Sequence, residues 1–235
     1  TSSDAYALRF RGPAGAWFLT KQARDVVALL RPLGPCRVLE AGGGHAQLTG
    51  PLLRAGHRVT VQGSSPCCAE RVRRLSPAPF VASALERLPF RDGAFDAVVS
   101  VRTMAHAADP TAFLRECARV AARAVVVDFP SRRSVNVLAD LLFALKRGVE
   151  KDTRPYRVFR PAEPDAMIAG RGWRRTGTRA QFFWPMVIHR FHGLPALGRV
   201  LEALPALLGL RRLLGSPVLA LYRSDARIAP AALDT

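Results

Sequence analysis

The chain has 235 residues, of which 49% are hydrophobic, and it carries a formal net charge of +17. This length and apolar content suffice for a full core, so we expect a single domain over residues 1–235. The longest apolar tracts, around 135–145 and 194–221, are too short or are interrupted by charges, which excludes a helix that spans a bilayer.

The first predicted element is an N-terminal helical arm over residues 1–33. A helical pattern runs from Gln22 to Arg31 and is ended by Pro32 and Gly34. Five apolar strands then alternate with helices, and Asp109 is the predicted N-cap of the last of these helices. The predicted strands are 37–40, 57–62, 80–82, 94–100 and 124–129, and the helices are 46–54, 66–75 and 111–121. This alternation of near-continuously apolar strands with helices predicts a parallel sheet covered on both faces.

The pattern changes after residue 130. Two apolar helical segments are predicted, and we expect the regions 131–160 and 186–215 to be helical cap inserts, with Pro205 among the residues that break the second. No repeat or second-domain boundary is visible. The remaining predicted elements are a helix over 134–146, a basic loop over 151–160, a helix over 163–169 that ends at Gly170, a strand over 173–184 and a last strand over 217–222.

The basic residues are nearly all arginine. This excess indicates either an anionic partner (nucleic acid, a membrane surface or an acidic substrate) or a compositional bias toward Ala, Arg, Pro and Gly. The four cysteines lack metal-binding spacing, so we expect no metal site and a reducing environment. With no secretory signal visible, we expect a cytoplasmic protein. The cysteines are Cys36, Cys67, Cys68 and Cys117.

A glycine-dense turn follows the first predicted strand. Glu40 ends that strand, Ala41 follows it, and Gly42, Gly43 and Gly44 come next. In a parallel α/β sheet the ligand crevice lies at the carboxyl ends of the strands, and glycines let backbone approach a ligand there. A dinucleotide fingerprint would need a third glycine where the chain has Gln47, and a phosphate-binding loop would end in Gly-Lys-Ser/Thr. The turn therefore disfavours both NAD and ATP.

Four motifs in order resemble those of class I S-adenosylmethionine-dependent methyltransferases, of the small-molecule type that includes quinone-biosynthesis enzymes. The family's acid-x-Gly-x-Gly-x-Gly motif is matched by Glu40, Gly42 and Gly44, with Ala46 in the last place. The other three motifs are matched by residues 63–66, 88–98 and 106–110. The resemblance implies a Rossmann-like, mostly parallel sheet of seven strands with an antiparallel last strand, helices on both faces, and S-adenosylmethionine as cofactor.

The resemblance also implies which residues bind the cofactor. Glu40 and the glycine backbone would hold its methionine part, and the segments after the second, third and fourth strands would hold the nucleoside. Two usual acids are missing, at Gly63 for the ribose and at Ala84 for the adenine, where Gln62 and Glu86 are the candidate substitutes. The implied cofactor-binding residues are Glu40, Ala41, Gly42, Gly43, Gly44, Gln62, Gly63, Ser64, Ser83, Ala84, Leu85 and Val101.

His106 is the candidate catalytic residue, as a base beside the methyl acceptor, because an imidazole titrates near neutrality. The apolar cap inserts favour a small, hydrophobic, lipid-like acceptor, and their basic neighbours favour peripheral membrane contact. Two alternatives remain. The arginines and aromatics over 132–179 suit an RNA methyltransferase, and the missing acids suit a non-catalytic partner protein that keeps the fold.

Overall fold

The computed structural model describes residues 10–134, 157–169, 172–185, 188–189 and 193–225. One seven-stranded sheet runs through it in the order β3-β2-β1-β4-β5-β7-β6. Its strands are β1 (Arg37–Glu40), β2 (Arg58–Gly63), β3 (Phe80–Ala82), β4 (Phe95–Ser100), β5 (Ala121–Phe129), β6 (Trp173–Phe182) and β7 (Ser216–Ser224). The sheet and its strand count confirm the predicted architecture.

The strand directions follow the prediction as well. The pairs β1–β2, β1–β4, β2–β3 and β4–β5 are parallel. The last strand, β7, is antiparallel to both of its neighbours, β5 and β6. The order changes direction between β1 and β4, so the crevice typical of doubly wound sheets is expected at the carboxyl ends of these two strands.

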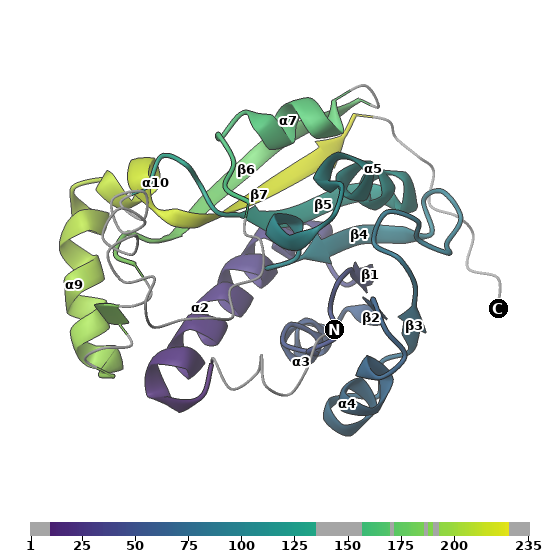
Figure 1. Cartoon of the computed structure of the whole chain (residues 1–235), viewed down its shortest axis with the longest axis horizontal. Helices are drawn as coiled ribbons and strands as arrows, with labels where there is room; N and C mark the ends of the chain where they lie inside the picture. Colours follow the sequence, from purple (N-terminus) through teal and green to yellow (C-terminus); the bar gives the residue numbers. More distant parts are fainter. Residues whose placement is uncertain (1–9, 135–156, 170–171, 186–187, 190–192, 226–235) are drawn as a thin grey trace.

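Helices cover both faces of the sheet (Figure 1). The helices α2, α3 and α4 lie on one face, and α5 and α7 lie on the other. Their bounds are α2 (Gly12–Leu30), α3 (Thr49–Arg54), α4 (Cys68–Leu75), α5 (Pro110–Val120) and α7 (Glu163–Ile168), and two short 3-10 helices are η1 (Arg31–Leu33) and η2 (Met104–His106). At the β6 end of the sheet, the helix α9 (Pro195–Leu207) stands beside α2, and α10 (Leu210–Leu214) packs against α9 and β6.

The core is divided between the two faces because neighbouring strand residues point in opposite directions. In β1, Val38 belongs to the cluster under α2, α3 and α4, whereas Leu39 belongs to the cluster under α5 and α7. Val98 and Val99 of β4 divide in the same way. Buried parallel strands therefore require apolar side chains on both faces, which explains the continuous apolar runs in the sequence.

Some predicted boundaries were wrong. Helix α2 begins at Gly12, ten residues before the expected start at Gln22, and α3 begins at Thr49 rather than at residue 46. Pro205 does not break its helix but lies inside α9, which ends at Leu207. The break falls at Gly209, whose φ of 72° is left-handed backbone that favours glycine.

The cap inserts are described only in part. Three predicted features lie outside the described residues: the helix over 134–146 apart from Ser134, the first part of the basic loop over 151–160, and Gly170. Within 186–215, α9 packs on α2 and α10 on β6. No helix among the described residues is long and apolar enough to cross a membrane. The role of both inserts as an acceptor cap remains a prediction.

Candidate functional site

The glycine turn lies at the carboxyl edge of the sheet, between β1 and α3. The backbone N–H of Ala41 donates to the Val99 carbonyl in β4 at 2.9 Å, and that of Gly43 donates to the Gln62 carbonyl in β2 at 2.8 Å. Gly42 has a φ of 72°, in the left-handed region. The turn is therefore joined to both neighbouring strands at the predicted crevice.

Two of the glycines are required by packing inside the protein. A Cβ on Gly42 would overlap the Thr103 side chain, which follows β4. A Cβ on Gly43 would lie 2.5 Å from Cγ of Glu40. The turn thus closes tightly on the strand ends, and these two positions exclude side chains whether or not a ligand is bound.

Glu40 supports the turn from beneath. Its carboxylate accepts from the Leu48 backbone at 3.2 Å and from the Thr49 hydroxyl at 2.5 Å, and the side chain is buried. Burial raises its pKa to about 7, against the opposing effect of these hydrogen bonds and of Arg102. Glu40 was expected either to accept from the backbone around the methionine part of the cofactor or to interact with its ammonium group. The structure directs both oxygens to the start of α3, and the cofactor-binding role of Glu40 remains a prediction.

Gln62 forms hydrogen bonds within the protein, and its predicted contact with the ribose remains a prediction. Its side-chain carbonyl accepts from the Gly42 N–H at 2.9 Å, and its amide nitrogen donates to the carbonyl and the hydroxyl of Ser83 at 2.8 and 3.1 Å. The side chain is fully buried. Gln62 thereby fixes the glycine turn to the segment after β3, which uses the hydrogen-bonding atoms that a ribose would need.

The Phe80 ring lies against Gly63, the position at which the family usually has its ribose-binding acid. A Cβ on Gly63 would lie 2.9 Å from the Phe80 ring and 3.4 Å from the Cα of Gly44. Two other predicted residues, Ser64 and Ala84, are exposed at this edge, and Leu85 is half-buried. The nucleoside side therefore offers a hydroxyl and apolar surface in place of a carboxylate.

A charged network joins Arg102, in the segment after β4, to Asp128, and the sequence did not predict this link. Arg102, next to the predicted Val101, has a φ of 56°. Its backbone N–H donates to Asp128 at the end of β5 at 2.5 Å, and Gln22 of α2 donates to the other Asp128 oxygen at 3.1 Å. The Arg102 guanidinium lies 4.6 Å from the centre of the Phe10 ring. No sequence motif links these residues, which come from four separate segments.

Asp128 and Arg102 set the electrostatics of this edge. Burial raises the pKa of Asp128 to about 6, and hydrogen bonding and the charge of Arg102 oppose this rise. The charge of the same guanidinium opposes the rise that burial causes in the pKa of Glu40. One cation therefore acts on two buried carboxyl groups, at the ends of β1 and β5.

His106 is exposed at the end of η2, between β4 and α5. The segment at 157 approaches this turn, because the Arg157 N–H donates to the Ala105 carbonyl at 3.1 Å. The structure thus places His106 at the same edge of the sheet as the glycine turn. Its catalytic role remains a proposal.

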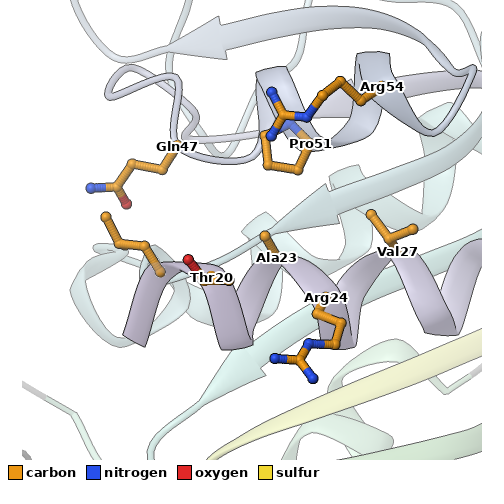
Figure 2. Close-up of a pocket in the computed structure, with 8 residues that line it drawn as sticks. Thr20, Ala23, Arg24, Val27, Gln47, Pro51 and Arg54 are labelled. Carbon is orange, nitrogen blue, oxygen red and sulfur yellow. The ribbon is translucent and has the colours of Figure 1, made fainter. Parts of the chain in front are cut away.

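A groove of about 460 Å³ lies between α2 and α3 (Figure 2). Gln47 at one end connects the groove to the glycine turn, and Arg24 and Arg54 stand on opposite helices. None of the predicted site residues lines it. The lining residues are Leu19, Thr20, Ala23, Arg24, Val27, Gln47, Pro51 and Arg54.

These residues fit S-adenosylmethionine in part. The glycine turn is fixed in place by Gln62 and Glu40, and it carries no Cβ at Gly42 or Gly43. The nucleoside side lacks a carboxylate at Gly63 and Ala84. A lost charged hydrogen bond costs about 1.5–3 kcal/mol. The residues therefore fit the methionine half of the cofactor and would hold the nucleoside with weaker, neutral groups.

Several arginines of the proposed RNA face are engaged in ion pairs. Arg175 pairs with Asp165 at 2.5 Å, and Arg174 pairs with Asp225 at 2.5 Å. A third, Arg179, lies 3.7 Å from Asp25. These carboxylates compete with any phosphate for the same guanidinium groups, which weakens the case for RNA.

Known proteins resemble the chain in sequence and in fold. Residues 39–126 match the family described as a methyltransferase domain. A ubiquinone biosynthesis O-methyltransferase from Methylocella silvestris is 34% identical over 92 residues, 37% of this chain and 36% of that protein. One from Rhizobium etli is 27% identical over 168 residues, 66% of this chain and 67% of that protein. The chain thus matches about a third of the first relative's length and about two thirds of the second's.

A solved structure extends the likeness over the whole fold. The magnesium protoporphyrin IX methyltransferase from Synechocystis, with bound SAH, is 15% identical and has a TM-score of 0.64. The match covers 94% of this chain and 95% of that one. Together with the sheet order, this likeness shows a Rossmann-like methyltransferase fold, and the sequence match to the methyltransferase domain family covers residues 39–126.

Proposed function

We propose that the protein transfers the methyl group of S-adenosylmethionine to a small, hydrophobic acceptor. The observation that carries this proposal is the glycine turn, which Gln62 and Glu40 fix at the carboxyl edge of the sheet. This edge is where open α/β sheets bind ligands. The relatives named as ubiquinone biosynthesis O-methyltransferases favour a hydroxyl group on the acceptor.

The bound cofactor would supply an activated methyl group, so the protein's main task is positioning. The backbone at Gly42–Gly44 would hold the methionine part, and Ser64, Ala84 and Leu85 would border the nucleoside. Arg102 brings a fixed positive charge to the same edge, where Phe10 and Asp128 restrain it.

His106 is our candidate for the base that removes the acceptor's proton. It is exposed beside the segment after β4, so an acceptor entering at this edge can reach its imidazole. A His106→Gln variant should keep its cofactor affinity and lose about 10²-fold or more in turnover. Unchanged turnover at neutral pH would exclude this role.

Calorimetric titration with S-adenosylmethionine and S-adenosylhomocysteine tests the proposal. We expect binding of both, and we expect Ala84→Arg to abolish it because the new side chain would fill the nucleoside edge. A matched control is Ala196→Arg, which changes an exposed alanine on α9 at the far end of the sheet. Absence of binding by the wild type at millimolar ligand would refute methyl transfer and favour a non-catalytic partner protein.

A further inference from the structure

The helices α9 and α10 carry most of the exposed large apolar side chains among the described residues. Leu75 is the one exception, and all the others lie between Leu194 and Leu214. The exposed fractions reach 67% for Val200 and 85% for Leu207. We call this group the leucine face. Its members are Leu194, Leu197, Val200, Leu204, Leu207, Leu208, Leu213 and Leu214.

The polarity of α9 is the reverse of that of an ordinary surface helix, which turns its apolar stripe toward the core. Leu197, Val200, Leu204 and Leu207 recur at helical spacing on the outer side. The buried side holds Glu202 together with small or cyclic residues. The most apolar side of this helix is thus the side that the described part of the chain leaves exposed.

Specific contacts hold α9 in this orientation. The carboxylate of Glu202 accepts from the backbone N–H groups of Phe183 and Trp184 at 2.9 and 3.0 Å. It also lies 3.1 Å from Nε2 of His189, which is fully buried. Turning the leucine face inward would expose this network and break it. The outward direction is therefore built into the fold.

Cations flank the leucine face and exposed acids are missing from it. Arg199, Arg211 and Arg212 belong to the same two helices, and no described carboxylate forms a salt bridge with them. Glu202 is the acidic residue of this stretch and is buried. A second copy docked face to face would bring further cations from the same two helices and no exposed acid of this stretch to pair with them. An anionic surface with an apolar interior satisfies both the cations and the leucines.

We propose that α9 and α10 form a membrane-contact surface that inserts the leucine face at the headgroup boundary of an anionic bilayer. Arg199, Arg211 and Arg212 would lie at the phosphate level. Contact of this kind leaves the glycine turn free, because β6 and β1 are separated by three strands in the sheet order. The surface goes beyond the proposed methyl transfer and would bring the enzyme to acceptors dissolved in the lipid.

Sedimentation with vesicles tests the proposal. The wild type should bind vesicles of phosphatidylcholine mixed with phosphatidylglycerol, and binding should fall at least tenfold on pure phosphatidylcholine. The double variant Leu204→Gln/Leu207→Gln should lose at least tenfold on the anionic vesicles. The control is Leu75→Gln, which changes an exposed leucine on α4 (56% exposed, against 62% for Leu204) and should bind like the wild type.

Three outcomes would overturn the proposal: no binding by the wild type, equal binding by the double variant, or equal loss in the control. Sedimentation velocity without lipid tests whether a second copy of the chain, and not a membrane, covers the leucine face. Lipid-free self-association that the double variant abolishes, without vesicle binding, would assign the face to a second copy of the chain. Thermal unfolding confirms that the variants are folded. Titration of the double variant with S-adenosylhomocysteine separates failure of this surface from failure of the proposed function.

Discussion

Arg102 shows how single residues organise the site. A non-glycine residue with a φ of 56° carries backbone strain of about 1–3 kcal/mol, and such residues persist where their surroundings fix them. Here the Asp128 carboxylate holds the Arg102 N–H, and the charge of Arg102 acts on both Asp128 and Glu40. The strained residue thus ties the ends of β1, β4 and β5 into one arrangement.

Glu40 should make stability depend on pH. Its pKa is 4.5 when unperturbed and about 7 in the folded chain, so the folded state binds this proton more tightly. The stabilisation is fully present below about pH 4.5 and is lost as pH rises to about 7, by roughly 3 kcal/mol. Urea unfolding at pH 5 and pH 8 should therefore show a smaller loss in Glu40→Gln than in the wild type.

The exposed Glu70 of α4 provides the control for this measurement. A Glu70→Gln variant should follow the wild-type pH profile, because an exposed carboxyl group has similar surroundings in the folded and unfolded chains. Parallel profiles for Glu40→Gln and the wild type would show that Glu40 does not bind its proton more tightly in the folded state.

Gly63 and Phe80 should be energetically coupled. A side chain at position 63 meets the Phe80 ring, so Gly63→Asp should destabilise the protein by about 1–3 kcal/mol. Adding Phe80→Ala should recover about 1 kcal/mol relative to the sum of the single changes. The double variant should also bind S-adenosylhomocysteine about tenfold more tightly, because it restores a charged acceptor at the ribose edge. Strictly additive unfolding free energies would disprove the coupling.

At the scale of elements, α5 is fixed at its start by Asp109, as predicted from the sequence. The Asp109 carboxylate accepts from the N–H groups of Thr111 and Ala112 at 2.8 and 3.0 Å. Asp109→Ala should lower the free energy of unfolding by about 1 kcal/mol in chemical denaturation. Asp109→Asn should retain most of it, since asparagine is also a strong N-cap. Equal losses in both variants would implicate the charge and not the cap.

Helix α9 shows that hydrophobic content does not identify a core. Its apolar residues have the spacing of a buried stripe, and yet Glu202 and Gly198 occupy the inner side. The Cβ of any larger residue at Gly198 would lie 3.0 Å from the Trp17 ring, so the close packing against α2 leaves little room for a side chain here. The inner side is selected by shape and hydrogen bonding, and the leucines remain outside.

For the whole molecule, the net charge of +17 should produce measurable self-repulsion. Raising the salt concentration from about 0.01 M to about 0.15 M shortens the Debye length from about 30 Å to about 8 Å. The melting temperature should rise by about 2–4 °C, equivalent to about 1 kcal/mol for a chain of this size. A falling melting temperature in scanning calorimetry would mean that attractive pairs, such as Arg175 with Asp165, dominate the electrostatics.

The sequence by itself determined the sheet. Apolar runs bounded by turn residues gave β1 and β3 their observed ends, because strands buried on both faces need continuous apolar side chains. The glycine turn after Glu40 placed the candidate site at the carboxyl edge. Helix starts were less predictable: the chain from 46 to 48 has a helix-forming composition, and yet tertiary contacts use it as part of the turn.

Only the tertiary structure decided what the site residues contact. Glu40 and Gln62 were predicted to bind the cofactor, and only folding shows that Thr49 and Ser83 lie within hydrogen-bonding distance of them. The link between Arg102 and Asp128 joins residues 26 positions apart, and sequence spacing does not encode such proximity. The sequence could not predict the outward leucine face for a similar reason. Periodicity shows that a helix has an apolar side, but it does not show which side neighbouring elements will cover.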